Sequence, residues 1–120
     1  MGQSADLMAR EFKVGREEQD KFAMESHHKA HAAGERGFYK SHVVGVATPD
    51  GKVVDRDNNV RGDTSMEKLS TLKPVFYKDG TITAGNASPL TDGAAACLLM
   101  KESKARELKL QPLGAIRGYG

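Results

Sequence analysis

The run from Thr81 to Met100 reads TITAGNASPLTDGAAACLLM and decides the fold, because it places a turn of small residues between two segments with the composition of strands. Thr81 to Ala84 is β-rich, and residues 94–100, AAACLLM, are apolar without interruption. Unbroken apolar runs of this length are typical of strands buried on both faces of a parallel sheet. We therefore expect an α/β fold in which residues 94–100 form a core strand that buries Cys97.

The turn between the two segments, Gly85-Asn86-Ala87-Ser88, has the composition of a loop that approaches a ligand. Glycines at 85 and 93 relax the restrictions on φ at its ends. Small residues would let backbone amides and the side chains of Asn86 and Ser88 come close to a bound molecule. The same residue types are common in tight loops for backbone reasons alone, so composition by itself favours an ordinary loop between two strands.

Composition limits the class of protein. Of 120 residues, 38% are hydrophobic and 28% charged, as in soluble globular proteins. A formal net charge of +2 is too small to indicate a nucleic-acid surface, and a single cysteine excludes an internal disulfide. No apolar run is long enough to span a bilayer, and residues 1–13 lack the apolar core of a signal peptide. We expect a protein of a reducing compartment that is not secreted.

Periodicity and turn chemistry predict the remaining elements. Helical signals occur at four segments, 4–12, 16–33, 64–72 and 102–108. A hairpin is expected at 43–54, around the turn Thr48-Pro49-Asp50-Gly51, and a final strand at 113–116. Ser4 can cap the first helix, and Thr64 with Glu67 has the spacing of a capping box. A buried strand with so few neighbours indicates that the chain is a piece of a larger fold.

Several segments resemble thiolases in the order and spacing of that family. Besides GTITAGNASPLTDGAAACLLM they are MGQSAD, REEQDKFAMESH, DNNVRGDTSMEKLSTLKPVF and KARELKLQPLGAIRGY. The DNNVRGDTS run and Pro89-Leu90-Thr91 are most similar to the fatty-acid-oxidation branch, typified by the β subunit of the trifunctional protein. The resemblance implies an α+β loop domain over residues 1–79 that covers coenzyme A. It also implies that residues 80–120 end one half of the layered α/β core and begin the next, as a strand-helix-strand edge.

Cysteine and histidine, the residue types of many catalytic and metal sites, are present, but their spacing and sequence neighbours do not match such sites. Apolar neighbours around Cys97 favour a buried structural thiol over a reactive thiolate. His27 and His31 share a helical face, but no third ligand is at hand, so surface or packing histidines are favoured. Thiolases use two cysteines and a histidine in a Gly-His-Pro setting, and none of those motifs occurs here. We expect no catalytic and no metal-binding residue in this chain.

The resemblance implies ligand contacts instead. Arg61 matches a basic residue beside the nucleotide of coenzyme A, and Lys68 lies in the following helix, where some thiolases have a serine near the coenzyme. Ser88 matches the serine that contacts the pantetheine arm, with Asn86 beside it, and Met1 matches a methionine near the acyl pocket. From the residues alone, Arg61 and Lys68 are more simply explained as solvated charge.

The implied activity of the complete protein is thiolytic cleavage of a 3-oxoacyl-CoA, or the reverse Claisen condensation, through an acyl-cysteine. This chain alone is expected to be inactive, and no cofactor is expected to be bound permanently, coenzyme A and acyl-CoA being substrates. The expected partners are the remainder of the thiolase and either further copies or a trifunctional α-type subunit, in the bacterial cytoplasm or mitochondrial matrix. Two alternatives remain open: a non-catalytic module that binds coenzyme A, and an interaction fragment whose apolar strand inserts into a partner's sheet.

Overall fold

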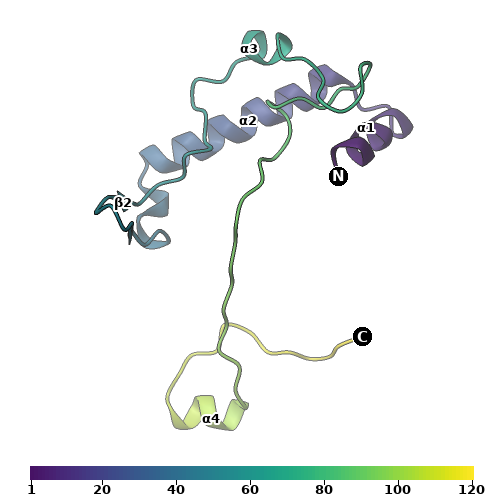
Figure 1. The fold of residues 1–120 in the computed structure, drawn as a ribbon. Coiled ribbons are helices and arrows are strands. Elements are labelled where there is room, and N and C mark those ends of the chain that lie inside the picture. Colours follow the sequence, from purple (N-terminus) through teal and green to yellow (C-terminus); the bar gives the residue numbers. More distant parts are fainter. The chain divides into compact units, whose positions relative to one another are not determined.

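The computed structural model describes all residues 1–120 and divides them into two compact units, Met1–Leu90 and Thr91–Gly120. Figure 1 shows the elements in chain order. The first unit contains α1 (Gly2–Glu11), α2 (Arg16–Glu35), the 3-10 helix η1 (Phe38–Ser41), β1 (Val46–Ala47), β2 (Val53–Val54) and α3 (Met66–Ser70). The second unit contains α4 (Glu102–Glu107).

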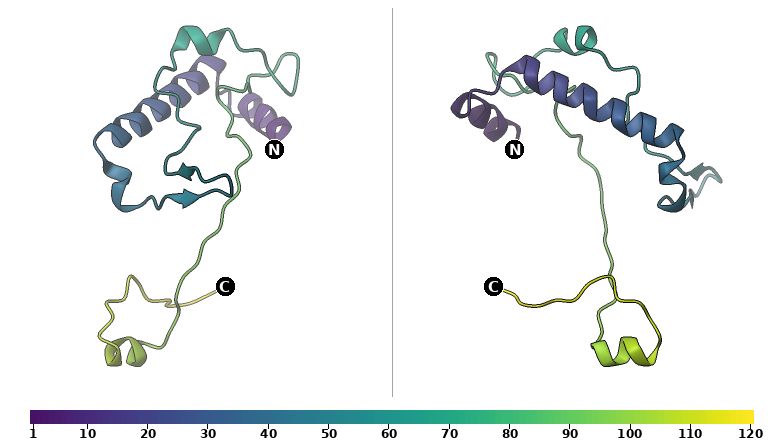
Figure 2. Two further views of the ribbon diagram at one scale, coloured as in Figure 1. Left: turned by 60° about the vertical axis from the view of Figure 1, so that its left-hand side comes forward. Right: turned by 180° about the vertical axis from the view of Figure 1, so that it is seen from behind.

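Helix α2 is the longest element of the first unit, and both views of Figure 2 show α3 beside it. The helix follows Gly15, whose backbone is extended, and carries Glu17 and Glu18 in its first turn. Carboxylates there are stabilised by the positive end of the helix dipole. The observed bounds confirm the helix predicted at 16–33 and extend it to Glu35.

Two predicted caps are displaced. Helix α1 begins at Gly2 with Met1 as its N-cap, and the backbone N–H of Ala5 donates to the carbonyl of Met1 at 2.9 Å. Ser4 therefore lies inside the helix and does not cap it. At α3 the capping side chain is Ser65 rather than Thr64, because the Ser65 hydroxyl accepts from the backbone N–H of Lys68 at 3.3 Å.

The hairpin is confirmed but short. Strands β1 and β2 are antiparallel, with Val46 opposite Val54 and Ala47 opposite Val53. They form the only sheet of the structure. The Thr48 backbone N–H donates to the Lys52 carbonyl at 2.8 Å and closes the predicted turn.

The other predicted strands do not form within this chain. Residues 81–84, 94–100 and 113–116 have no strand geometry, and the whole run 91–101 is exposed. The prediction that Cys97 is buried is wrong for this chain, because its thiol is exposed. The physical reason is that a strand needs a neighbour for its backbone groups, and no backbone hydrogen bond joins residues 91–100 to any other segment.

Few apolar side chains are buried in either unit. The buried apolar residues are Ala33, Leu69, Ile82 and, in the second unit, Ala105. Phe22 on α2 is 77% exposed. None of the helices has both the length and the apolar character that crossing a membrane requires.

The first unit extends past the domain boundary that the sequence predicts near Gly80, because it ends at Leu90. Asp6 of α1 accepts a hydrogen bond from Thr81, and Asp20 of α2 accepts one from Asn86. These bonds make residues 81–86 part of the same compact unit as the helices. The assignment of residues 1–79 and 80–120 to two thiolase domains stays a prediction.

Candidate functional site

The segment that leads into the Gly85–Ser88 turn is bound to α1 by one carboxylate. Asp6 is 1% exposed, and its Oδ1 accepts hydrogen bonds from the backbone N–H groups of Thr81 at 2.7 Å and Ile82 at 3.1 Å. The segment passes close to this side chain, since a Cβ at Gly80 would lie 2.6 Å from Asp6 Oδ2. Asp6 thus satisfies two backbone N–H groups of this segment, and the Ile82 carbonyl accepts from the backbone N–H of Val75 at 2.9 Å.

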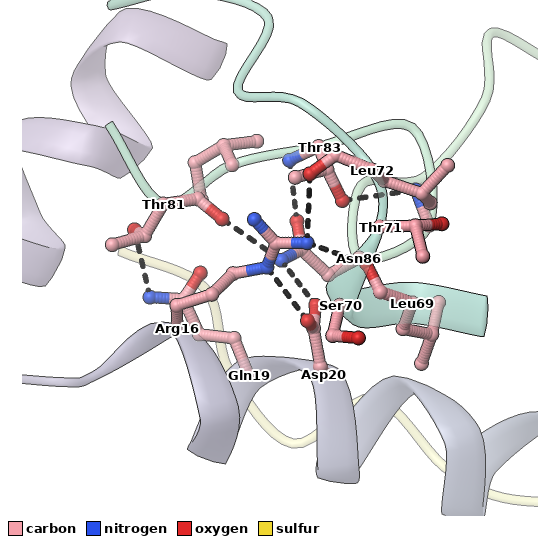
Figure 3. Close-up of polar contacts among 12 residues, drawn as sticks. Arg16, Gln19, Asp20, Leu69, Ser70, Thr71, Leu72, Thr81, Thr83 and Asn86 are labelled. Carbon is pink, nitrogen blue, oxygen red and sulfur yellow. Dashed lines mark hydrogen bonds and ion pairs between the residues drawn. The ribbon is translucent and has the colours of Figure 1, made fainter. Parts of the chain in front are cut away.

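The turn itself is closed by Asn86. Its Oδ1 accepts from the backbone N–H of Thr83 at 2.8 Å, and its Nδ2 donates to the carbonyl of Thr81 and to Asp20 Oδ1, both at 2.9 Å (Figure 3). Asp20 lies on α2 and is 2% exposed. Both N–H groups of the Asn86 side chain are therefore used within the protein, and the amide fixes the turn against α2.

The other oxygen of Asp20 belongs to a partly buried ion pair. Arg16 Nε donates to Asp20 Oδ2 at 2.6 Å, and Arg16 Nη2 donates to the carbonyls of Leu69 at 2.6 Å and Leu72 at 3.1 Å. Those carbonyls lie at the C-terminal end of α3, where helix carbonyls lack partners. Figure 3 shows that the guanidinium lies between α2 and this end of α3. One ion pair thus connects α2, α3 and the turn.

An apolar groove of about 690 Å³ lies beside the turn. Its walls include Met8 of α1, Phe12 just after that helix, Phe22 of α2, and residues 87–89. Ser88 is exposed and lines this groove. The buried network therefore presents a serine hydroxyl at the edge of an apolar surface, an arrangement suited to a long ligand that carries polar groups.

The loop that carries Arg61 is supported by α2. The backbone N–H of Arg61 donates to His27 Nδ1 at 3.2 Å, His28 Nε2 is 2.8 Å from the carbonyl of Thr64, and the His31 ring lies against Gly62. The Arg61 side chain is exposed and enters no ion pair. Three histidines of α2 thus pack against this loop, and no group of metal-ligating side chains is formed.

Lys68 is already paired. Its Nζ donates to the carbonyl of Asp63 at 2.7 Å and to Asp63 Oδ2 at 2.6 Å, and this pair is exposed. The hydrogen bond from Lys68 is the main reason that the pKa of Asp63 is lowered from its ordinary value. The pKa of Glu67 is also lowered, chiefly by a hydrogen bond with the side chain of Ser65. Both carboxylates therefore stay ionised around α3.

The structure thus places the predicted ligand residues in two groups. Asn86 and Ser88 share the turn, and Arg61 and Lys68 lie in the 61–70 segment, whereas Met1 is exposed at the start of α1 and does not line the groove. The sequence analysis missed the residues that hold the turn and the segment leading into it: Asp6, Arg16, Asp20 and Gln19, whose Nε2 donates to Thr81 Oγ1 at 2.9 Å. The i, i+4 spacing of Arg16 and Asp20 was the one available signal, because it allows an ion pair on a helix.

Comparison with known proteins decides the family. The family model described as thiolase, N-terminal domain, matches residues 1–103. This chain belongs to the thiolase family. A probable acetyl-CoA acyltransferase of Staphylococcus aureus strain N315 is 47% identical over 124 aligned residues, which cover all of this chain and 32% of that protein. The thiolase segment thus spans about a third of the length of the curated relatives it matches.

Solved structures agree with this thiolase assignment. Human mitochondrial 3-ketoacyl-CoA thiolase in complex with CoA matches with a TM-score of 0.81 and 36% identity, over 91% of this chain and 27% of that chain. The dimeric peroxisomal thiolase of Saccharomyces cerevisiae matches with a TM-score of 0.86 and 40% identity, over 95% of this chain and 29% of that chain. Bacillus anthracis acetyl-CoA acetyltransferase matches with a TM-score of 0.85 and 43% identity, over 94% of this chain and 29% of that chain. The predicted family and its α/β fold class are confirmed, the chain being part of that fold.

Proposed function

We propose that this thiolase segment binds the coenzyme A thioester on which the complete enzyme acts. The complete enzyme cleaves a 3-oxoacyl-CoA by thiolysis or forms it by Claisen condensation. The observation that carries this proposal is the turn held by Asp6 and Asp20, which presents Ser88 beside an apolar groove. The human mitochondrial relative in complex with CoA supports the class of ligand.

Each ligand contact follows from the chemistry of its group. The Ser88 hydroxyl exchanges a hydrogen bond with the pantetheine arm, whose amides both donate and accept. Arg61 meets the nucleotide, because a planar guanidinium both stacks on a base and binds phosphate oxygens in pairs. Lys68 adds a second positive charge near that end, and Met1 lies by the acyl group. Asn86 contributes chiefly by shaping the turn, since its two N–H groups are already bonded.

The contribution of this segment to the rate is therefore orientation. A bound and oriented thioester reacts as though it were at very high local concentration, and this effect needs no proton transfer from the binding residues. The acyl-cysteine step belongs to residues elsewhere in the complete enzyme. In this scheme residues 1–79 form the loop domain over the coenzyme, and residues 80–120 belong to the core.

The exposed run 94–100 supports the second part of this scheme. It is apolar and extended, and its backbone groups have no partner within the chain. We infer that it pairs with strands of the remaining thiolase, which makes it a core strand only in the complete protein. The same run would also serve the alternative of an interaction fragment, in which the sheet belongs to a different protein.

The assembly and cellular context are proposed from the same family membership. A homodimer or larger homo-oligomer is favoured, as the yeast relative is dimeric. Similarity of DNNVRGDTS to the fatty-acid-oxidation branch favours a role in β-oxidation, with a trifunctional α-type subunit as a further partner. The compartment in this proposal is the bacterial cytoplasm or the mitochondrial matrix.

Steady-state kinetics of the complete enzyme test the proposal. Loss of one neutral hydrogen bond in Ser88→Ala should raise KM for acetoacetyl-CoA by about 2- to 10-fold, and loss of a charged contact in Arg61→Ala by about 10- to 100-fold at low salt. Both contacts exist in the ground and transition states, so kcat should change little. Ser4→Ala and Arg56→Ala are the matched controls, because both side chains are exposed and away from the groove. An unchanged KM in Ser88→Ala and Arg61→Ala would refute the binding role.

A further inference from the structure

The Arg16–Asp20 ion pair has no role in the proposed ligand contacts, yet it lies between the two groups of residues that make them. Asp20 is 2% exposed and Arg16 is 24% exposed at its side chain. Each oxygen of the Asp20 carboxylate has a different partner, Oδ1 with Asn86 and Oδ2 with Arg16. Asp20 thus contacts the turn through Asn86 and the end of α3 through Arg16. A buried carboxylate with two such partners is a candidate for fixing the position of the turn relative to α3.

We propose that Asp20 is a positioning residue for coenzyme A binding, which fixes the turn that carries Ser88. It acts through two routes, directly through Asn86 and indirectly through Arg16 and the end of α3. The inference rests on the proposed function, because the position of Ser88 has a kinetic consequence only if Ser88 contacts the ligand.

The direct route is a chain of hydrogen bonds. Asp20 Oδ1 accepts from Asn86 Nδ2, and Asn86 Oδ1 in turn accepts from the backbone N–H of Thr83. Asn86 precedes Ser88 by two residues, so loss of the hydrogen bonds by which its side chain holds Thr81 and Thr83 releases the backbone that leads to Ser88. The Asn86 amide cannot close the turn in the same way without an acceptor on α2, because Nδ2 would lose one of its two partners.

The indirect route passes through α3. Arg16 holds the carbonyls of Leu69 and Leu72, and the side chains of the same two residues lie against Gly85. A Cβ at Gly85 would collide with Leu69 Cδ2 and would lie 2.6 Å from Leu72 Cδ1, so there is no free space between these side chains and the turn. A shift of the α3 end therefore moves the turn as well.

A neutral residue at position 20 cannot serve both routes. Asparagine would present one acceptor and one donor, and both Arg16 Nε and Asn86 Nδ2 are donors. One of the two contacts would then bring two donors together. Asp20→Asn should therefore break one route, whereas Asp20→Ala breaks both and also leaves the guanidinium of Arg16 without its carboxylate.

A double-mutant cycle in the complete enzyme tests the inference. Asp20→Ala should raise KM for acetoacetyl-CoA by about 2- to 10-fold, no more than Ser88→Ala does, with kcat within about twofold, because it displaces a contact made equally in the ground and transition states. In the Ser88→Ala background, the same substitution should raise KM by less than half that factor, since coupled residues are non-additive. Asp20→Asn should give an intermediate KM. Glu25→Ala is the matched control on the same helix, because Glu25 is paired only with exposed Lys29 at 3.8 Å.

The outcomes separate the two proposals. If Ser88→Ala raises KM but Asp20→Ala raises it by the same factor in both backgrounds, or only lowers Tm, Asp20 is merely structural and this inference is wrong. If Ser88→Ala leaves KM unchanged, the proposed function fails first, and the positioning role fails with it. Should Asp20→Ala not fold, Asn86→Ala breaks the direct route at a half-buried side chain, and an additive effect on KM in that variant would equally overturn the inference.

Discussion

Replacing Asp6 by alanine should release the segment that leads into the turn. The Asp6 carboxylate accepts two backbone N–H groups on one oxygen, and alanine removes both contacts at once. The Ile82 N–H is buried, so its loss should cost about 1.5–3 kcal/mol, the range for hydrogen bonds to charged groups. Thr81 is half-buried, so water can replace its lost partner and the cost there should be smaller, about 1 kcal/mol.

Native-state hydrogen exchange of the complete enzyme measures this effect directly. The two costs together lower the free energy of local opening by about 2.5–4 kcal/mol, so the amides of Thr81 and Ile82 should exchange about 70- to 1,000-fold faster in Asp6→Ala. Asp6→Asn keeps an acceptor at the Oδ1 position and should accelerate exchange far less.

Asp79→Ala is the control for this experiment. Its carboxylate is 78% exposed and forms only a surface ion pair with Arg10, so exchange at residues 81 and 82 should be unchanged. If exchange in Asp6→Ala matches that of the control, the carboxylate does not hold the segment. Other contacts would then hold residues 81 and 82 in place.

Three further outcomes are expected. The purified 120-residue chain should not turn over acetoacetyl-CoA, and activity that Cys97→Ala abolishes would contradict its assignment as a binding segment. Cys97 should react with a thiol reagent in this chain as an exposed thiol does, but much more slowly in the complete enzyme, and equal rates would show that residues 94–100 are not a core strand. Lys68→Met should raise the pKa of Asp63 toward its ordinary value in an NMR titration. Because the pKa of Asp63 is lowered in the folded state, ionised Asp63 stabilises the fold at pH values above its ordinary pKa, and this stabilisation is lost as the pH falls through the folded-state pKa. An unchanged Asp63 titration in Lys68→Met would show that the ion pair does not persist in solution.

The helices and the hairpin could be predicted because their signals are local. Gly15, the carboxylates that follow it and the periodicity of residues 16–33 all act within a few turns of α2. The strand predicted at 94–100 does not form in this chain, because its backbone groups have no neighbouring strand to pair with.

The candidate site was predictable only where residues are exposed in a loop. The turn at 85–88 could be recognised from its composition and from the family resemblance. The residues that hold it could not, because Asp6 and Thr81 are 75 positions apart and nothing in the sequence near either one indicates the other. Asn86, predicted from the sequence as a ligand contact, uses both its N–H groups in internal hydrogen bonds. Its contact with a ligand stays a prediction.

The small number of buried apolar residues in the first unit has a calorimetric consequence. Heat-capacity change and denaturant dependence both scale with the apolar surface that leaves water, and here only Ala33, Leu69 and Ile82 are buried. Unfolding of residues 1–90 alone should therefore show a small ΔCp and a shallow urea transition. The large negative ΔCp typical of burying apolar surface should appear when exposed apolar side chains outside the groove, such as Phe38 and Val44, are covered by the rest of the thiolase. For this segment, most of the heat-capacity change therefore accompanies joining with the remaining protein, and little of it accompanies the formation of its helices.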